Sequence, residues 1–295
     1  MTATATTTTT GMVTATATTA ASARAPVLWT DPGDIPPGSG PTVVTIGQFD
    51  GVHRGHRRLL TATRRRADAL GVPACAITFA RHPLSLLAPH RSPAELSGLD
   101  AKIRLLHDCG MDIVLALPAT RDVLGTPAER FADDLLCQRL GVCAVLVGPD
   151  FRYGAGAAGT PDSLAARLAP HGGEVTVLPT VLRGGERVSS TRIRAEIGRG
   201  RLDRAAWLLG RPYAVPVTVG PDRTVVPDGG SAWPCPGRYP VVPDLPGADR
   251  SGSARTPGWT RPALELTVSG PRASLPGSTA LPGARLMLSF TGEPG

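Results

Sequence analysis

The sequence predicts an α/β fold with a parallel sheet, followed by a small, irregular β domain. From Thr42 to about Thr180, short and almost continuously apolar segments alternate with stretches that suit helices, which is typical of a parallel sheet covered on both faces. After Tyr213 the helical periodicity disappears, and proline- and glycine-rich segments surround short alternating pieces. The β domain is therefore expected to have long loops.

Five strands and six helices are expected in the first part of the chain. The strands are expected at Val43–Gly47, Ala74–Phe79, Ile113–Leu117, Val142–Gly148 and Val175–Leu178. The helices are expected at His53–Leu70, Asp100–Cys109, Pro127–Leu140, Pro161–Ala169, Ser190–Ile197 and Leu202–Leu209. Strand pieces of the β domain are expected at 214–219, 263–268 and 284–290.

The first 40 residues are expected to be disordered. They consist of Thr/Ala repeats and a Pro/Gly-rich stretch, which offer almost nothing to bury. They lack the charged and apolar regions of a signal peptide, and Met12 is a second candidate start codon. We expect a cytoplasmic protein that is not in a membrane, because no apolar run approaches the roughly 18 residues of a membrane span.

Composition narrows the possible functions. The net charge is +7 with a pI near 9.8, but the basic residues are almost all arginine, with Lys102 the only lysine, in a chain rich in Ala, Gly and Pro. This bias is typical of a GC-rich genome, and it weakens the argument for nucleic-acid binding. Without a second lysine, no P-loop nucleotide site can be formed. The five cysteines show no C-x-x-C spacing and are expected to be buried and reduced.

A glycine-rich turn with two histidines follows the first expected strand. It reads T-I-G-Q-F-D-G-V-H-R-G-H from Thr45 to His56. His53 and His56 lie at i and i+3 at the start of a helix, where free N–H groups favour an anion. The spacing by itself leaves three interpretations open, namely a phosphate site, a buried structural pair and a metal site. The metal site lacks an obvious third ligand.

Three further stretches carry candidate binding residues. The segment R-V-S-S-T-R-I-R (187–194) combines helix-capping hydroxyls with guanidinium groups, which suits polyphosphate but also an ordinary capped helix. The segments I-T-F-A-R-H-P (77–83) and V-L-V-G-P-D-F-R-Y-G (145–154) end two expected strands with aromatic, acidic and histidine side chains. In parallel sheets ligands bind at such carboxyl ends. The residues by themselves fit a packed loop at 145–154 equally well, and a lone histidine such as His82 is by default structural.

Taken together and in this order, these stretches resemble the FAD synthetase (FMN adenylyltransferase) module of the bacterial bifunctional riboflavin kinase/FAD synthetase family. The matching motifs are G-x-F-D-G-V-H-x-G-H at 47–56, T-F-x-x-H-P at 78–83, V-G-x-D-F-R-Y-G at 147–154 and S-S-T-R-I-R at 189–194. The resemblance covers about 170 residues. It implies a Rossmann-like nucleotidyltransferase domain over 41–212 and a β-barrel-like, degenerate riboflavin kinase domain over 213–295, partly disordered.

The resemblance also implies a reaction and its ligands. FMN and ATP would react to give FAD and pyrophosphate, with Mg²⁺ accompanying ATP and no covalent enzyme intermediate. Small molecules are thus the expected partners, with no nucleic acid. The implied catalytic residues are His53, His56 and Arg194. The implied ATP-binding residues are Gly47, Gln48, Phe49, Asp50, Gly55, Ser190, Thr191 and Arg194. The implied flavin-binding residues are Phe79, His82, Pro83, Asp150, Phe151 and Tyr153, and no resident metal ligand is expected.

Two departures from the family pattern are visible. Gln48 stands where the family usually has Asn. Downstream of Tyr213 no Pro-Thr-x-Asn segment appears, although the family's kinase site uses one to hold Mg-ATP. We therefore expect riboflavin kinase activity to be lost. Two other functions stay open, an adenylyltransferase for a modified flavin or another phosphorylated acceptor, and a flavin- or nucleotide-binding protein without turnover.

Overall fold

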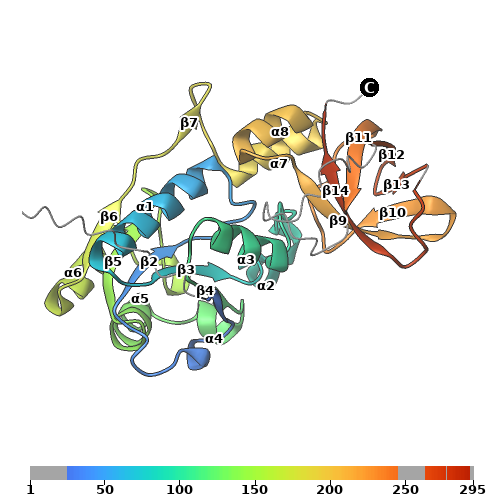
Figure 1. Ribbon diagram of the computed structural model, residues 1–295. Coiled ribbons are helices and arrows are strands. Elements are labelled where there is room, and N and C mark those ends of the chain that lie inside the picture. The colour runs from blue at the N-terminus through green and yellow to red at the C-terminus, as the bar shows by residue number, and fades with distance from the viewer. Residues whose placement is uncertain (1–24, 245–262, 277, 293–295) are drawn as a thin grey trace, which may run out of the picture.

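The computed structural model describes residues 25–244, 263–276 and 278–292, which form a sheet domain and a barrel (Figure 1). The strands are β1 Val27–Trp29, β2 Thr42–Ile46, β3 Ala74–Phe79, β4 Ile113–Leu117, β5 Val142–Val147, β6 Glu174–Val177, β7 Leu182–Arg183, β8 Glu186–Arg187, β9 Ala214–Val219, β10 Thr224–Pro227, β11 Gly237–Asp244, β12 Leu264–Ser269, β13 Arg272–Ser274 and β14 Arg285–Phe290. The α-helices are α1 Arg54–Leu70, α2 Leu84–Leu87, α3 Leu99–Asp108, α4 Arg121–Leu124, α5 Ala128–Arg130, α6 Pro161–Leu168, α7 Ser190–Gly198 and α8 Leu202–Leu209. Short 3₁₀ turns cover Pro32–Asp34, Pro89–Arg91, Ala155–Ala157, Ala169–His171 and Pro221–Arg223, and Phe131–Arg139 forms a π-helix.

The sheet is parallel, with the strand order β1-β4-β3-β2-β5-β6. Going along the chain, β3 and β4 are added on one side of β2, whereas β5 and β6 are added on the other. The order therefore reverses between β2 and β5, and ligands of such sheets bind in the crevice at this point, beyond the carboxyl ends of the strands. This confirms the predicted Rossmann-like fold.

Helices cover both faces of the sheet, as the apolar strands require. In β2, Val43 packs with residues of α1 and α3 on one face, while Val44 packs with residues of α6 and the π-helix on the other. Both valines are fully buried. Each strand thus contributes alternate side chains to two separate cores.

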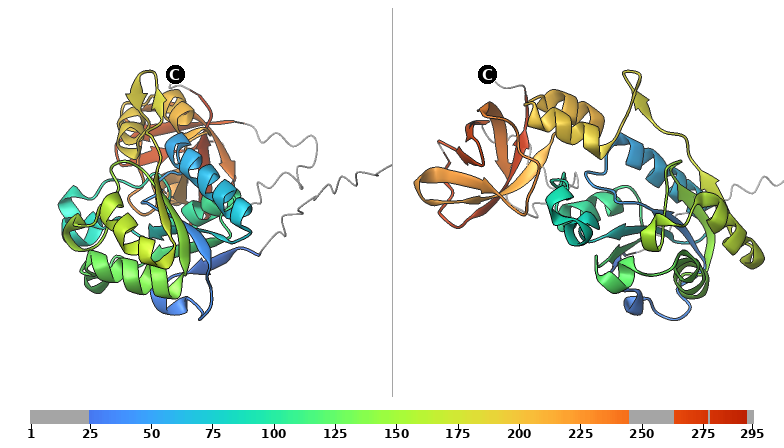
Figure 2. Two further views of the ribbon diagram at one scale, coloured as in Figure 1. Left: turned by 90° about the vertical axis from the view of Figure 1, so that its left-hand side faces the viewer. Right: turned by 180° about the vertical axis from the view of Figure 1, so that it is seen from behind.

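The C-terminal part forms a closed antiparallel barrel of six strands in the order β10-β13-β12-β11-β14-β9. The prediction of a barrel-like β domain is thus confirmed. Its core also takes up α7 and α8, which lie between sheet and barrel in Figures 1 and 2, and two further buried residues from outside the barrel, Leu96 and Val188. Partial disorder was expected within 213–295 without a named segment, and residues 245–262, 277 and 293–295 of this range lie outside the described residues.

Two expectations about local structure were wrong. Residues 25–40, expected to be disordered, include β1, which pairs with β4 at the edge of the sheet, and a 3₁₀ turn closed by a capping box at Asp31. The strand is stabilised by this pairing and by burial of Trp29, which a local composition cannot reveal. The stretch expected as one helix at Pro127–Leu140 is a short α-helix followed by a π-helix. Residues 1–24 lie outside the described part of the chain.

Candidate active site

The turn between β2 and α1 is held in an unusual backbone conformation. Phe49 and Val52 have positive φ angles of 47° and 37°, and Gly51 between them has a φ of 76°. Non-glycine residues adopt such angles only where the surroundings compensate the strain. Here both side chains are fully buried, and the Phe49 ring lies so close to Gly47 that a Cβ there would be 3.2 Å from it. The glycine at 47 is therefore needed for packing of this turn.

The two histidines stack on one another at the start of α1. Their ring centroids are 3.6 Å apart with an interplanar angle of 14°. His53 is the N-cap, and its Nδ1 accepts a hydrogen bond of 3.2 Å from the backbone N–H of His56. This bond places the proton of neutral His53 on Nε2. Gly55 lies against the His53 ring, because a Cβ at 55 would be 3.1 Å from it. His56 also meets the Phe49 ring edge-on at 5.2 Å.

Both imidazoles are neutral in the free protein. Burial lowers the pKa of His53 to about 4, and nearby Arg187, Arg211 and Arg194 act in the same direction. Burial, followed by the neighbouring His53, lowers the pKa of His56 well below its ordinary value. The buried Nδ1 of His56 has no hydrogen-bond partner among the described residues. The pair thus presents neutral imidazoles at the start of α1, with one buried ring nitrogen left without a partner among the described residues.

A cavity of about 250 Å³ lies beside the histidine pair, at the point where the strand order reverses. Three parts of the chain line it: the start of α1, the loop after β5 and the segment from β6 to α7. These include His53, His56, Gly148, Arg187, Ser189 and Ser190. Ser189 is the N-cap of α7, so the free N–H groups of two helices, α1 and α7, meet at one cavity. This arrangement favours a polyphosphate anion.

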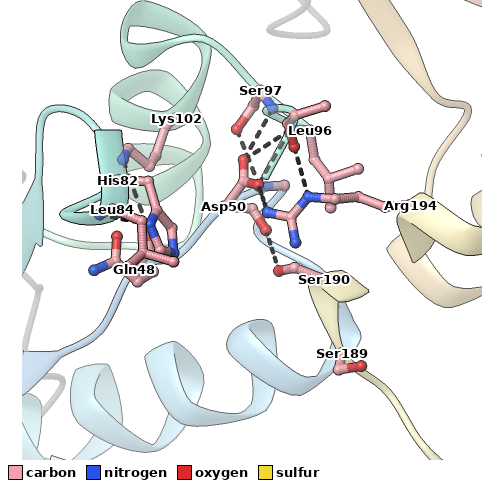
Figure 3. Close-up of polar contacts among 12 residues, drawn as sticks. Gln48, Asp50, His82, Leu84, Leu96, Ser97, Lys102, Ser189, Ser190 and Arg194 are labelled. Carbon is pink, nitrogen blue, oxygen red and sulfur yellow. Dashed lines mark hydrogen bonds and ion pairs between the residues drawn. The ribbon is translucent and has the colours of Figure 1, made fainter. Parts of the chain in front are cut away.

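Asp50 ties this turn to two distant segments (Figure 3). Its carboxylate accepts hydrogen bonds from the backbone N–H groups of Leu96 and Ser97, at 3.0 and 3.1 Å. It also forms an ion pair of 2.5 Å with Arg194 of α7, while its backbone oxygen accepts a bond of 2.9 Å from Ser190. Asp50 is 9% exposed, so this network fixes the turn from within.

The only lysine lies in the same region. Lys102 of α3 is 6% exposed, and its Nζ donates to the backbone oxygen of Phe79 at 2.6 Å and to that of Gln48 at 3.5 Å. It therefore joins the carboxyl ends of β2 and β3. Burial lowers its pKa, although nearby Asp50 and Glu95 act in the opposite direction.

His82 stands on the same side of the turn as Lys102. Its Nδ1 accepts a bond of 3.2 Å from the backbone N–H of Leu84. A small cleft is lined by His82, Gln48, Asp50, Glu95, Lys102 and Arg194. Burial, with a contribution from Arg194, lowers the pKa of His82.

The residues expected to contact flavin fall into two groups on opposite sides of β2. Phe79 ends β3, and His82 and Pro83 follow it. Asp150 and Phe151 follow β5 instead, and the two ring-bearing residues of that loop, Phe151 and Tyr153, stack on each other at 5.6 Å.

The side chains of the β5 loop are engaged within the protein. Tyr153 is 6% exposed in the sheet core, and its hydroxyl lies 3.3 Å from Ser163. Asp150 is exposed and paired with Arg187. The structure therefore does not bring the six residues together around one pocket.

The expected ATP-binding residues are also divided. Ser190 lines the cavity beside the histidines. Thr191 is exposed on α7 and is not among the cavity-lining residues, and Arg194 points to Asp50 and to the backbone oxygen of Ala94 on the far side of the turn. The placement of Arg194 on the acid, rather than free toward the cavity, separates it from the histidine pair.

Sequence reasoning missed Lys102, Glu95 and Arg187 as residues of the site. Arg187 belongs to the quoted R-V-S-S-T-R-I-R stretch, and Lys102 stood out as the single lysine of an arginine-rich chain. The sequence could therefore have pointed to Arg187 and Lys102. No sequence feature points to Glu95, because it lies in an irregular loop without a motif.

All five cysteines are free, but only Cys75 is buried, so the expected burial is wrong for the other four, which are half-buried. Burial raises the pKa of the Cys75 thiol to about 12. Within 25–244, 263–276 and 278–292, no cluster of three or more His, Cys, Asp or Glu side chains suited to a metal ion is present. In the same parts of the chain, none of the helices combines the length and the apolar character of a membrane span.

Comparison with known proteins places this arrangement in context. A family model described as FAD synthetase matches residues 36–192. The bifunctional riboflavin kinase/FMN adenylyltransferase of Escherichia coli (strain K12) is 39% identical over 173 residues, which are 59% of this chain and 55% of the relative. The protein of the same name from Pseudomonas fluorescens is 38% identical over 173 residues, again 59% and 55% of the two chains. The chain thus spans about half the length of the curated relatives it matches.

A solved structure is similar over almost the whole chain. It is described as a macrolide-efflux protein from Streptococcus pneumoniae, with a TM-score of 0.73 and 21% identity, and it covers 92% of this chain and 99% of its own. At this identity the likeness concerns the fold alone, and it extends over the sheet domain and the barrel.

Proposed function

Because the chain belongs to the FAD synthetase family, we propose that it is an FMN adenylyltransferase, which makes FAD and pyrophosphate from FMN and ATP. The observation that carries the proposal is the stacked His53–His56 pair beside a cavity at which the N-termini of α1 and α7 meet. Neutral imidazoles and free helix N–H groups together suit a bound polyphosphate.

In the proposed reaction ATP occupies the cavity beside the histidines. An oxygen of the FMN phosphate attacks the α-phosphorus of ATP, the bond from that phosphorus to the bridging oxygen breaks, and pyrophosphate leaves. The N–H groups of His53 and His56 donate to the α-phosphate oxygens, where negative charge grows in the transition state. Ser190 and the N-terminus of α7 hold the leaving pyrophosphate.

The acceptor enters from the other side of the turn, where His82, Lys102 and Arg194 line a cleft. Arg194 and Lys102 already bind Asp50 and the backbone oxygen of Phe79, so we propose that they shape this side of the acceptor site, while the phosphate of FMN lies within reach of the α-phosphorus beside the histidine pair. Phe79 and Pro83 lie beside them and are proposed to border the flavin. Because Asp150, Phe151 and Tyr153 lie beyond β5, we propose that this loop borders the nucleotide cavity instead.

Magnesium enters the proposal as part of the ATP substrate. Protein sites usually hold Mg²⁺ by substrate phosphates together with one or two carboxylates. The candidate is Asp150, whose 65% exposed carboxylate directly follows Pro149, a wall of the cavity, and is paired with Arg187 in the free protein, so the ion would have to take the place of that partner. The ion would neutralise phosphate charge there.

Loss of riboflavin kinase activity is part of the same proposal. The barrel of this chain contains no Pro-Thr-x-Asn segment, which is the observation that supports it. We also propose a cytoplasmic protein that acts on small molecules rather than nucleic acid.

The test uses the purified full-length chain with Mg-ATP. FMN and riboflavin are supplied separately, and the products are separated by chromatography. We expect FAD from FMN and no FMN from riboflavin. Absence of FAD from FMN contradicts the adenylyltransferase, whereas formation of FMN from riboflavin contradicts only the loss of kinase activity. Phosphorylated non-flavin acceptors at the same concentration test the choice of acceptor.

A further inference from the structure

The barrel contacts the loop that carries the acceptor side of the site. Glu95 forms a β-bridge with the barrel segment Asp228–Ala232. Its backbone N–H donates to the backbone oxygen of Gly230 at 3.1 Å, and its backbone oxygen accepts from the N–H of Ala232 at 2.8 Å. The next residue, Leu96, is 3% exposed and packs in the barrel core.

The segment Ala94–Ser97, which contains Glu95 and Leu96, is also bonded to Asp50 and Arg194. The oxygen of Ala94 accepts from Nε of Arg194 at 2.5 Å, and the N–H groups of Leu96 and Ser97 donate to Asp50. Consecutive backbone groups of this segment therefore bind alternately to the site and to the barrel. A shift of the barrel segment would move the partners of Asp50 and Arg194 together with it.

The barrel segment is itself held firmly. The hydroxyl of the buried Tyr213 donates to the oxygen of Ala232 at 2.6 Å. Asp228 accepts hydrogen bonds from Thr218 at 2.7 Å and from Arg285 at 2.7 and 2.9 Å. Because this segment is held rigidly, it can fix the position of the loop Ala94–Ser97 that it contacts.

A cavity of about 730 Å³ opens at this contact. Its walls include Arg81 and Ser85 of the sheet domain and Gly229 and Gly230 of the barrel, and it shares Pro93 and Glu95 with the cleft that holds His82 and Arg194. The cavity therefore continues the acceptor side of the site toward the barrel.

We propose that the barrel segment Asp228–Ala232 positions the acceptor loop through Glu95 and forms one wall of the acceptor site, so that the barrel determines acceptor binding without carrying out phosphorylation. This inference rests on the proposed adenylyl transfer. The part of the acceptor remote from its reacting phosphate occupies the cavity between Arg81 and Gly230. The retained barrel thus serves the adenylyltransferase.

Two buried tyrosines of the barrel provide a matched pair of variants. Tyr213 and Tyr239 are each 1% exposed, each contacts the ring of Phe290, and each donates its hydroxyl to a backbone oxygen, that of Ala232 and that of Cys235 respectively. In the full chain, Tyr213→Phe is expected to raise the KM for FMN about fivefold, the factor that follows from one lost buried hydrogen bond, with the KM for ATP unchanged. Tyr239→Phe is expected to leave both constants unchanged.

A second pair fills the cavity without disturbing the barrel. Gly230 and Gly270 have φ angles of +74° and +77°, and a Cβ at either meets nothing within 4 Å. Asn tolerates this conformation. We expect Gly230→Asn to raise the KM for FMN about tenfold by occupying the cavity, and Gly270→Asn, in the turn between β12 and β13, to have no effect. The proposal is overturned if Tyr213→Phe has the same KM for FMN as Tyr239→Phe and Gly230→Asn has the same KM for FMN as Gly270→Asn.

Hydrogen exchange tests the support independently of turnover. In Tyr213→Phe the amides of residues 95–97 are expected to exchange faster than in the wild type, and in Tyr239→Phe they are expected to exchange at the wild-type rate. Unchanged exchange in Tyr213→Phe contradicts the support by the barrel. If the wild-type chain makes no FAD, the proposed function fails. The exchange measurement still shows whether the barrel supports residues 95–97.

Discussion

Asp50 and Arg194, which are 144 positions apart in the chain, form a nearly buried ion pair of 2.5 Å between the turn after β2 and the helix α7. Their side chains are 13% and 18% exposed. The pair connects the two segments to which the proposed reaction assigns ATP, and it also reaches the loop Ala94–Ser97 through Leu96 and Ala94. The geometry of the site therefore depends on one carboxylate and its partners.

The two members of this pair are expected to contribute unequally to stability. When Arg194→Met removes the guanidinium, Asp50 keeps two N–H donors, so we expect a loss of about 1–2 kcal/mol of unfolding free energy. Asp50→Asn leaves the guanidinium of Arg194 with only the backbone oxygen of Ala94 as a partner, so we expect a loss of about 3 kcal/mol or more of unfolding free energy. Urea unfolding measures both, and the double variant gives their coupling. A larger loss from Arg194→Met would contradict this account.

The role of His53 as a helix cap can be separated from its role in the chemistry. Asn is a good N-cap, so His53→Asn is expected to keep the stability of α1 while it lowers kcat about 100-fold through loss of the imidazole donor. His53→Ala loses the cap as well, and we expect about 1 kcal/mol lower unfolding free energy than for His53→Asn. Thermal unfolding and FAD formation are measured on both. If His53→Asn keeps full turnover, the imidazole has no chemical role.

His56 is expected to act on turnover more than on binding. His56→Ala removes a donor that is aimed at the developing charge, so we expect kcat to fall about 100- to 1,000-fold. ATP keeps its other contacts at the helix N-termini, so its affinity should change only a few fold. Calorimetric ATP titration beside steady-state rates separates the two effects, and an equal loss in both would indicate a binding role.

The stability of the protein is expected to fall as the solution becomes acidic. The pKa of His53 is about 4 in the folded state and near 6.5 when unfolded, so between these values the unfolded chain binds the additional proton. The contribution is complete above pH 6.5 and decreases as the pH falls toward 4, with a loss of roughly 2 kcal/mol at pH 5. Denaturant unfolding of wild type and His53→Asn between pH 5 and pH 7 tests this, and the variant should show the weaker dependence. Parallel curves would rule out His53 as the source.

Lys102 is expected to position the ends of β2 and β3. Lys102→Met keeps the length of the side chain but leaves the oxygens of Phe79 and Gln48 without their donor, so we expect a loss of about 1–3 kcal/mol and about a tenfold higher KM for FMN. Arg104→Met, on the exposed side of the same helix, serves as the control and should change neither quantity. An unchanged KM for FMN in Lys102→Met would restrict the lysine to a structural role.

Local patterns determined most of the secondary structure. The apolar runs of β3 and β4 coincide with the expected strands residue for residue, and α8 coincides with its expected helix. The i, i+3 spacing of His53 and His56 likewise predicted that the two side chains lie together, because such a spacing brings side chains to one side of a helix start, although it did not decide among a phosphate site, a structural pair and a metal site. These features depend on residues that are close in sequence.

Only the tertiary structure decided which groups meet across the chain. The sequence contained Asp50, Arg194, Lys102 and Glu95, but nothing in their spacing relates them, because their contacts depend on how the sheet, α7 and the barrel pack. The same holds for β1, which exists as a strand through its pairing with β4. Periodicity reports a residue's local environment, whereas an ion pair or a bridge across 140 residues is created by the packing of whole elements. The histidine pair could therefore be found in the sequence, but the network that surrounds it could be found only in the fold.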